Sequence, residues 1–122
     1  MKKILIIEDV FQIREIIQEI LDSEGYETFI ACNGAVGVEL AKEHKPDVIF
    51  CDLMMPELDG FGVLAALGES PTTASIPVII LTALSEEFNG QKAIEMGAVG
   101  YLTKPFLCSD LLEALKSFIK PS

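Results

Sequence analysis

The sequence predicts an α/β fold with five β-α units, a doubly wound parallel sheet and the strand order 2-1-3-4-5. Three observations lead to this prediction. Short apolar runs alternate with segments whose apolar residues recur at helical spacing. Strands that alternate with helices pair in parallel through right-handed crossovers. One run carries polar residues and suits an edge, whereas the wholly apolar runs suit the middle of the sheet. The 122 residues are expected to form one domain, 1–122.

The first unit is a strand followed by a helix. Residues 3–7 (KILII) read as a strand buried on both faces, and they end on Glu8 and Asp9. Residues 10–24 are predicted to form a helix, and Gly25 supplies its stop. The apolar residues at helical spacing are Ile13, Ile16, Ile17, Ile20 and Leu21.

The second unit begins with the weakest strand. Residues 26–31 (YETFIA) include polar positions, as expected near an edge. Asn33 can cap a second helix, which ends at Lys45–Pro46. The side chains expected to point inward are Val36, Leu40 and Ala41. We expect His44, in the last turn, to be solvated and favoured by the helix dipole, because no second histidine accompanies it as a ligand.

The third unit contains the central strand. Residues 48–51 (VIFC) are apolar at every position and end on a carboxylate, Asp52. Pro56 and Gly60 mark the turn that follows, and residues 61–67 are predicted to form a short helix.

The fourth unit pairs a strong strand with a weak helix. Residues 76–81 (IPVIIL) read as a buried strand that ends on Thr82. A helix is expected to start at Ser85 and to close at Gly97. Asn89–Gly90 lies inside it, and the glycine alone costs roughly 1 kcal/mol.

The fifth unit completes the pattern. Residues 98–103 (AVGYLT) are predicted to be the last strand, and they lead to Lys104–Pro105. Ser109 is expected to cap a strong terminal helix. The apolar residues of that helix are Leu111, Leu112, Leu115, Phe118 and Ile119.

Composition excludes several classes of function. The net charge is −10 and the pI about 4.4, so the surface repels a phosphate backbone and direct nucleic-acid binding by this domain is not expected. Cys32, Cys51 and Cys108 are widely spaced and suggest neither a disulfide framework nor a zinc site. No apolar run is long enough to span a bilayer, so no membrane association is expected. A cytoplasmic location is the expectation.

Polar side chains follow four of the predicted strands at the same edge of the sheet, namely Glu8 with Asp9, Asp52, Thr82 and Lys104. Ligands bind at this edge in open α/β folds, and strands one and three meet at the switch point. Two carboxylates about 4 Å apart repel by roughly 4 kcal/mol at an effective dielectric constant near 20. A divalent cation would relieve this repulsion, and so few protein ligands suit Mg²⁺ better than Ca²⁺.

The other two groups suit a phosphate. Lys104 adds an ammonium group and Thr82 a hydroxyl donor beside Asp52. Phosphoryl transfer needs mainly positioning and charge neutralisation. Asp52 can therefore serve as a nucleophile that forms an acyl phosphate.

With these residues in this order, the chain resembles a bacterial two-component response-regulator receiver domain (CheY-like) over essentially its whole length. The matching segments are Glu8–Asp9, DLMMPELDG from Asp52, Thr82–Ala83, and YLTKPF at 101–106. Each is weak alone, but together they are highly specific. Glu8 replaces the aspartate often found first in the acidic pair, which leaves the metal site credible.

The resemblance implies a role for each site residue. Asp52 would accept a phosphoryl group from a sensor histidine kinase or a histidine phosphotransfer protein. Mg²⁺ would be bound by Asp9, Asp52 and the backbone carbonyl of Met54, and by Glu8 through water. Such a domain is not an enzyme in the usual sense, since it assists only its own phosphorylation and dephosphorylation.

The resemblance also implies how the signal would spread. Lys104 would pair with the phosphate, and its bond to Pro105 would be cis. Thr82 would hydrogen-bond the new phosphate and Tyr101 would turn inward behind it, although Tyr101 could instead simply cover an edge strand. Phosphorylation would switch the surface around the fourth helix, fifth strand and fifth helix, which a downstream effector would read.

The resemblance also bears on the lifetime of the acyl phosphate, and it leaves the oligomeric state and the kind of regulator open. Met54 and Leu84 occupy positions that control water access in such domains, so bulky apolar side chains there should slow hydrolysis of the acyl phosphate. A homodimer is an open alternative. So is the choice between a stand-alone regulator, a phosphorelay intermediate and part of a longer regulator.

The same layout allows three rival functions. An FMN-binding flavodoxin shares this flavodoxin-like layout but needs a Ser/Thr/Gly-rich phosphate loop, where this chain has VFQIRE at 10–15. A Mg²⁺-dependent aspartyl-phosphate phosphohydrolase usually carries a second acid two residues after the nucleophile, where this chain has Met54. A receiver-shaped scaffold that is never phosphorylated would not need the complete set of site residues.

Overall fold

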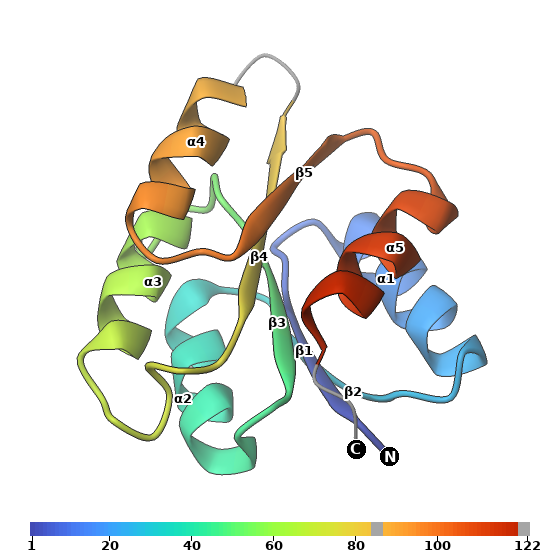
Figure 1. The fold of residues 1–122 in the computed structure, drawn as a ribbon, viewed down its shortest axis with the longest axis horizontal. Helices are drawn as coiled ribbons and strands as arrows, with labels where there is room; N and C mark the ends of the chain where they lie inside the picture. The colour runs from blue at the N-terminus through green and yellow to red at the C-terminus, as the bar shows by residue number, and fades with distance from the viewer. Residues whose placement is uncertain (84–86, 120–122) are drawn as a thin grey trace.

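The computed structural model describes residues 1–83 and 87–119 as one twisted parallel sheet with helices on both faces (Figure 1). The strands are β1 (Lys3–Ile7), β2 (Glu27–Ala31), β3 (Val48–Asp52), β4 (Val78–Ala83) and β5 (Gly100–Lys104). Their spatial order is β2-β1-β3-β4-β5 and all neighbouring pairs are parallel, which confirms the predicted fold class.

The helices divide between the two faces of this sheet. They are α1 (Phe11–Ser23), α2 (Gly34–His44), α3 (Gly60–Gly68), α4 (Glu87–Glu95) and α5 (Cys108–Phe118). Helices α2, α3 and α4 cover one face, and α1 and α5 cover the other (Figure 1). Within the described ranges, no helix combines the length and the apolar character needed to cross a bilayer.

The central strand β3 is buried along its whole length because helices cover both its faces. Successive side chains of a strand point to opposite faces. Phe50 therefore packs with α1 and α5, whereas Ile49 and Cys51 pack with α2 and α3. All three side chains are fully buried. The wholly apolar run in the sequence reflects this two-sided burial.

The strand register brings the polar residues to one level. Ile7 of β1 pairs with Cys51 of β3, so the acidic residues after each strand leave the sheet side by side. On the other side, Asp52 pairs with Leu81 and Ala83 pairs with Lys104. Groups from β1, β3 and β5 can therefore meet at the carboxyl edge.

Two predicted strands, 76–81 and 98–103, start two residues later in the structure, and the first of them also ends two residues later; the bounds of the other three strands agree to within one residue. The fourth strand starts at Val78 rather than at Ile76, and it includes Thr82 because its pairing with β5 continues to Ala83. Pro77, which has no N–H to donate, lies just before it. The fifth strand runs from Gly100 to Lys104. The predicted helix start at Ser85 lies outside the described residues.

Other expectations about side chains also need correction. Val36 is 42% exposed because it lies off the stripe of α2 positions, three and four residues apart, that faces the sheet. Asn33 caps α2 as predicted and accepts the main-chain N–H of Val36 at 2.8 Å. The inward positions are instead Gly37, Val38 and Ala41, with Leu40 partly buried. A Cβ on Gly37 would collide with Ile7 of β1, so the glycine permits close packing of helix on sheet.

The start of α5 and the environment of His44 differ from the predictions. Ser109 lies inside α5 and does not cap it. The capping hydrogen bond comes instead from the main-chain N–H of Leu107, which donates to the Asp110 carboxylate at 2.9 Å. His44 is not simply solvated. Its ring stacks on Phe29 with centroids 4.1 Å apart and is partly buried, because the end of α2 passes over the edge strand β2.

Candidate functional site

Three carboxylates gather at the carboxyl ends of β1 and β3. One oxygen atom from each of Glu8, Asp9 and Asp52 lies within 4.8 Å of the others. Glu8 is fully buried and Asp52 is 5% exposed. Burial weakens solvent screening, so the negative charges repel strongly unless a cation accompanies them.

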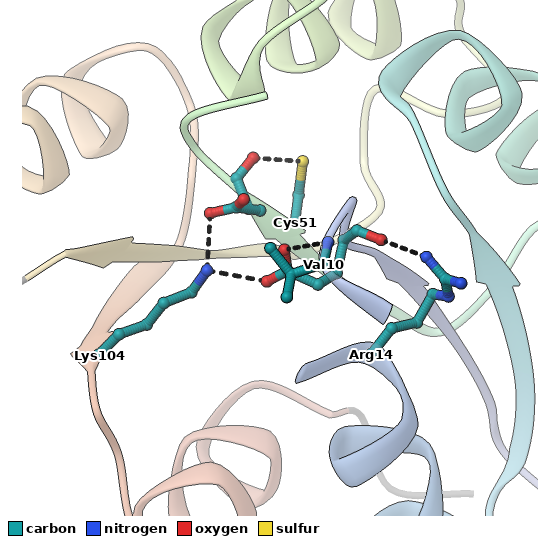
Figure 2. Close-up of polar contacts among 6 residues, drawn as sticks. Val10, Arg14, Cys51 and Lys104 are labelled. Atoms are coloured by element: carbon teal, nitrogen blue, oxygen red, sulfur yellow. Dashed lines mark hydrogen bonds and ion pairs between the residues drawn. The ribbon is translucent and has the colours of Figure 1, made fainter. Parts of the chain in front are cut away.

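The ammonium group of Lys104 supplies part of that compensation (Figure 2). Its Nζ donates to Glu8 Oε1 at 2.8 Å and to Asp52 Oδ1 at 3.0 Å. Burial alone would lower the pKa of Lys104, but the bonds and charges of Glu8 and Asp52 raise it above its ordinary value. The lysine is therefore charged and tied to the acidic pocket from the end of β5. Its peptide bond to Pro105 is cis.

Glu8 is held at every polar group that it carries. Its N–H donates to Ala31 O at 3.1 Å, and its Oε2 accepts the N–H of Val10 at 3.2 Å. Its carbonyl oxygen accepts a hydrogen bond from Arg14 Nη1 at 2.9 Å (Figure 2). Sequence reasoning did not find Arg14, although its position one turn into the helix after the acidic pair was a usable signal.

Asp52 ionises reluctantly in the absence of a metal. Burial, and then the charge of Glu8, raise the pKa of Asp52 to about 7 despite the opposing effect of Lys104. The adjacent Cys51 thiol donates to the carbonyl of Asp52 at 3.4 Å. Burial and these carboxylates raise the pKa of Cys51 far above its ordinary value, so this thiol is chemically inert.

Asp9 shows that the pocket suits a cation. Among the described residues, its Oδ1 is the buried side-chain polar atom that lacks a hydrogen-bond partner. A buried carboxylate oxygen is costly without a partner, and a divalent cation would provide one. Carboxylate oxygens with room for water suit Mg²⁺, so the residues present fit this ion.

Thr82 and Met54 are two further predicted site residues, and they differ in burial. Thr82 is 1% exposed on β4 and pairs with Thr103. Met54 follows Asp52 by two residues, and its side chain is 54% exposed. Leu84, the second residue expected to limit water access, lies outside the described residues.

Tyr101 lies against α4. Its hydroxyl accepts a hydrogen bond from Gln91 Nε2 at 2.8 Å. A Cβ on Gly90 would come within 2.7 Å of its ring, so the glycine gives the ring a place to pack. Gly90 therefore has two effects: it is the helix-weakening residue that the sequence indicated, and it leaves space for the Tyr101 ring to pack on α4.

Replacing Asp9 with asparagine is expected to weaken Mg²⁺ binding at least about tenfold, because the unpartnered oxygen loses its charge. Isothermal titration calorimetry of the intact and variant chains measures this. Asp22→Asn makes the same charge change at an exposed position of α1 and should leave the affinity unchanged. Equal affinities of all three chains would contradict the assignment of Asp9 as a ligand.

The fold and this pocket define an open α/β protein with a candidate divalent-cation site at the carboxyl edge of its sheet, and comparison with known proteins establishes the family. A family model described as "Response regulator receiver domain" matches residues 4–116. The chain belongs to the response regulator receiver family, whose members act in two-component signal transduction. The flavodoxin and phosphohydrolase alternatives find no support in these comparisons.

Individual relatives span different lengths. Sporulation initiation phosphotransferase F of Bacillus subtilis is 33% identical over 118 residues, which cover 97% of this chain and 94% of the relative. The DNA-binding dual master transcriptional regulator RpaA of Synechocystis is 38% identical over 120 residues, which cover 98% of this chain and 50% of the relative. The chain thus spans about half the length of several curated relatives that it matches.

Solved structures agree with the fold. Chemotaxis protein CheY4 of Vibrio cholerae superimposes with a TM-score of 0.91 at 30% identity, covering 98% of this chain and 99% of that one. The receiver domain of sensor histidine kinase PA1611 of Pseudomonas aeruginosa, described with a magnesium ion coordinated in its active site cleft, gives a TM-score of 0.88 at 27% identity. It covers 96% of each chain.

Proposed function

We propose that Asp52 is the phosphoryl acceptor of a single receiver domain that spans residues 1–122, and that its phosphorylation switches a signalling surface. One observation carries the proposal. Asp52 ends the central strand next to Glu8 and Asp9, with Lys104 Nζ 3.0 Å from its Oδ1. This combination of an acceptor carboxylate, a cation pocket and an ammonium group suits phosphoryl transfer.

In the proposed reaction, a carboxylate oxygen of Asp52 forms a bond to phosphorus while the bond between phosphorus and the donor's histidine nitrogen breaks. Lys104 neutralises charge on the arriving phosphoryl oxygens, and Thr82 supplies a hydroxyl donor. Glu8, Asp9 and Asp52, with the carbonyl of Met54, would hold Mg²⁺. Mg²⁺ bound there would supply charge neutralisation and would favour the ionised form of the Asp52 carboxylate.

The proposed partners follow from this chemistry. The donor is a sensor histidine kinase or a histidine phosphotransfer protein, and the output is read by a downstream effector. Two relatives are described as transcriptional regulators, which supports an effector that controls transcription. The chain does not turn over an external substrate in this proposal. Its free thiols at Cys32, Cys51 and Cys108 support a reducing, cytoplasmic location.

Incubation of the intact chain with Mg²⁺ and acetyl phosphate is expected to add one phosphoryl group, measured by intact mass spectrometry. Asp52→Asn should abolish the addition completely, because the amide is not a nucleophile for phosphorus. Asp22→Asn is the matched control and should be phosphorylated normally. A phosphoryl group on Asp52→Asn, or none on the intact chain with acetyl phosphate or phosphoramidate, would overturn the proposal.

The proposed switch surface is α4 with β5 and α5. Gly90 weakens α4 and contacts the Tyr101 ring, so α4 and Tyr101 are expected to rearrange together when Asp52 is phosphorylated. Hydrogen exchange should therefore show α4 less protected than β3 and altered by a phosphoryl analogue. Protection of α4 equal to that of β3, with or without the analogue, would contradict this.

A further inference from the structure

Arg14 connects the first turn of α1 to the end of β1. Its main-chain N–H donates to Val10 O at 3.0 Å, as a helix requires. Its side chain turns back so that Nη1 donates to the carbonyl oxygen of Glu8 at 2.9 Å (Figure 2). The guanidinium carbon lies 5.4 Å from the centre of the Phe11 ring, a cation–π distance that restrains the side chain further.

This bond acts on the peptide group that joins Glu8 to Asp9. The carbonyl of Glu8 belongs to that peptide plane, so fixing its direction also fixes the direction in which Asp9 leaves the chain. The other groups of Glu8 are already held by Ala31, Val10 and Lys104. Arg14 completes the set with a charge-assisted bond to the carbonyl.

The start of α1 offers little else to fix this peptide. Val10 occupies the N-cap position and makes no side-chain cap hydrogen bond. Asp9, the next residue toward the strand, carries the buried oxygen Oδ1 that has no partner among the described residues. A carboxylate aimed into the pocket without a partner of its own depends on its backbone for orientation.

We propose that Arg14 is a positioning residue for the divalent cation site. By holding the carbonyl of Glu8, it orients the Glu8–Asp9 peptide so that the Asp9 carboxylate faces the pocket, and it thereby strengthens Mg²⁺ binding. This inference rests on the proposed Mg²⁺ site of Glu8, Asp9 and Asp52. Arg14 itself touches neither the cation nor the phosphoryl group in this account.

The proposal and simple electrostatics predict opposite signs. A guanidinium near the acidic pocket repels a cation, so removing its positive charge should tighten Mg²⁺ binding if charge alone matters. If orientation matters, removing the hydrogen bond should weaken Mg²⁺ binding even though a repulsive charge is lost. The direction of the change therefore separates the two explanations.

The test is the Mg²⁺ dissociation constant of Arg14→Met, measured by isothermal titration calorimetry at constant pH and ionic strength. Methionine keeps an apolar stem over Phe11 and removes the donor. We expect Arg14→Met to bind Mg²⁺ about tenfold more weakly than the intact chain. This is the lower end of the loss in metal affinity that is usual when a residue that holds a metal ligand in place is replaced. Lys42→Met, an exposed site on α2 with the same charge change, should bind Mg²⁺ as the intact chain does or slightly more tightly.

Two further measurements make the result specific. Arg14→Lys retains a donor that can reach a carbonyl, so it should bind Mg²⁺ at least as tightly as Arg14→Met. Thermal unfolding without Mg²⁺ gives the melting temperature of each variant and shows whether it is folded at the titration temperature. If Arg14 had only a structural role, its replacement would lower the melting temperature but leave the Mg²⁺ affinity of the folded chain unchanged.

Unchanged or tighter Mg²⁺ binding by folded Arg14→Met would overturn the inference. Equal weakening in Lys42→Met, or weaker binding by Arg14→Lys than by Arg14→Met, would overturn it as well. Failure of the intact chain to bind Mg²⁺ would instead overturn the proposed cation site itself, so the two failures are distinguishable.

Discussion

Replacing Lys104 with methionine is expected to lower the free energy of unfolding of the metal-free chain by about 2–3 kcal/mol at pH 8. The ammonium group donates to two buried carboxylates, Glu8 and Asp52, and its removal leaves their charges uncompensated. Breaking a buried ion pair costs about 3–5 kcal/mol, and the partial exposure of Lys104 reduces the figure here. Urea unfolding followed by circular dichroism measures the loss.

The effect should depend on pH and on Mg²⁺. The pKa of Asp52 is raised to about 7 in the folded chain, above the ordinary carboxyl value near 3.8. Between these two pH values the folded state therefore binds more protons than the unfolded state. The contribution of Asp52 to the free energy of unfolding consequently falls as the pH rises from about 4 to about 7. The loss in Lys104→Met should be smaller at pH 6 than at pH 8, and Mg²⁺ should restore stability at pH 8.

Lys42→Met is again the matched control, because it removes an exposed lysine of α2 with the same change of charge. It should change the free energy of unfolding by less than about 0.5 kcal/mol. A Lys104→Met chain as stable as the intact one at pH 8 without Mg²⁺ would mean that the two bonds of Lys104 contribute nothing to the fold.

Truncating Phe50 to alanine is expected to cost about 3–5 kcal/mol, the largest loss of stability that we predict for a single side chain. Phe50 is fully buried on β3 and packs with Ile4, Ile79 and Leu81 beneath α1 and α5. Its removal leaves a cavity that the two neighbouring strands cannot close, because both are paired with β3. Urea unfolding measures this loss too.

Phe11→Ala is the control for Phe50→Ala. The Phe11 side chain is 60% exposed at the start of α1, so its truncation should cost less than about 1 kcal/mol. A loss at Phe50 no greater than the loss at Phe11 would contradict the two-sided burial of β3.

Much of the fold and the acidic pocket could be predicted from the sequence because apolar runs end abruptly on polar residues. The strand VIFC at 48–51 is apolar at every position, which is typical of a strand covered on both faces. Once the strand order follows, Asp9, Asp52 and Lys104 must leave the sheet at one edge. The shared direction of the strands places these residues at one edge, and the strand order brings Asp9 next to Asp52 and Lys104 within reach of it.

Details set by side-chain contacts could not be predicted in this way. The bond from Arg14 to the Glu8 carbonyl depends on how α1 leaves β1, which periodicity does not record. Tyr101 lies on α4 because Gly90 leaves room for its ring. Helix caps were ambiguous for the same reason. Asn33 caps α2 as predicted, whereas Asp110 displaces Ser109 as the polar partner at α5.

The unequal burial of the thiols makes the chain convenient for spectroscopy. Cys51 is sealed in the core, while Cys32 and Cys108 are exposed. Cys32 directly follows β2 and Cys108 opens α5 just beyond β5, so the two accessible sulfur atoms flank opposite margins of the sheet at its carboxyl edge. Fluorophores or spin labels attached there would span the pocket without any engineered substitution. Such a pair can report movement across the proposed phosphorylation site in real time.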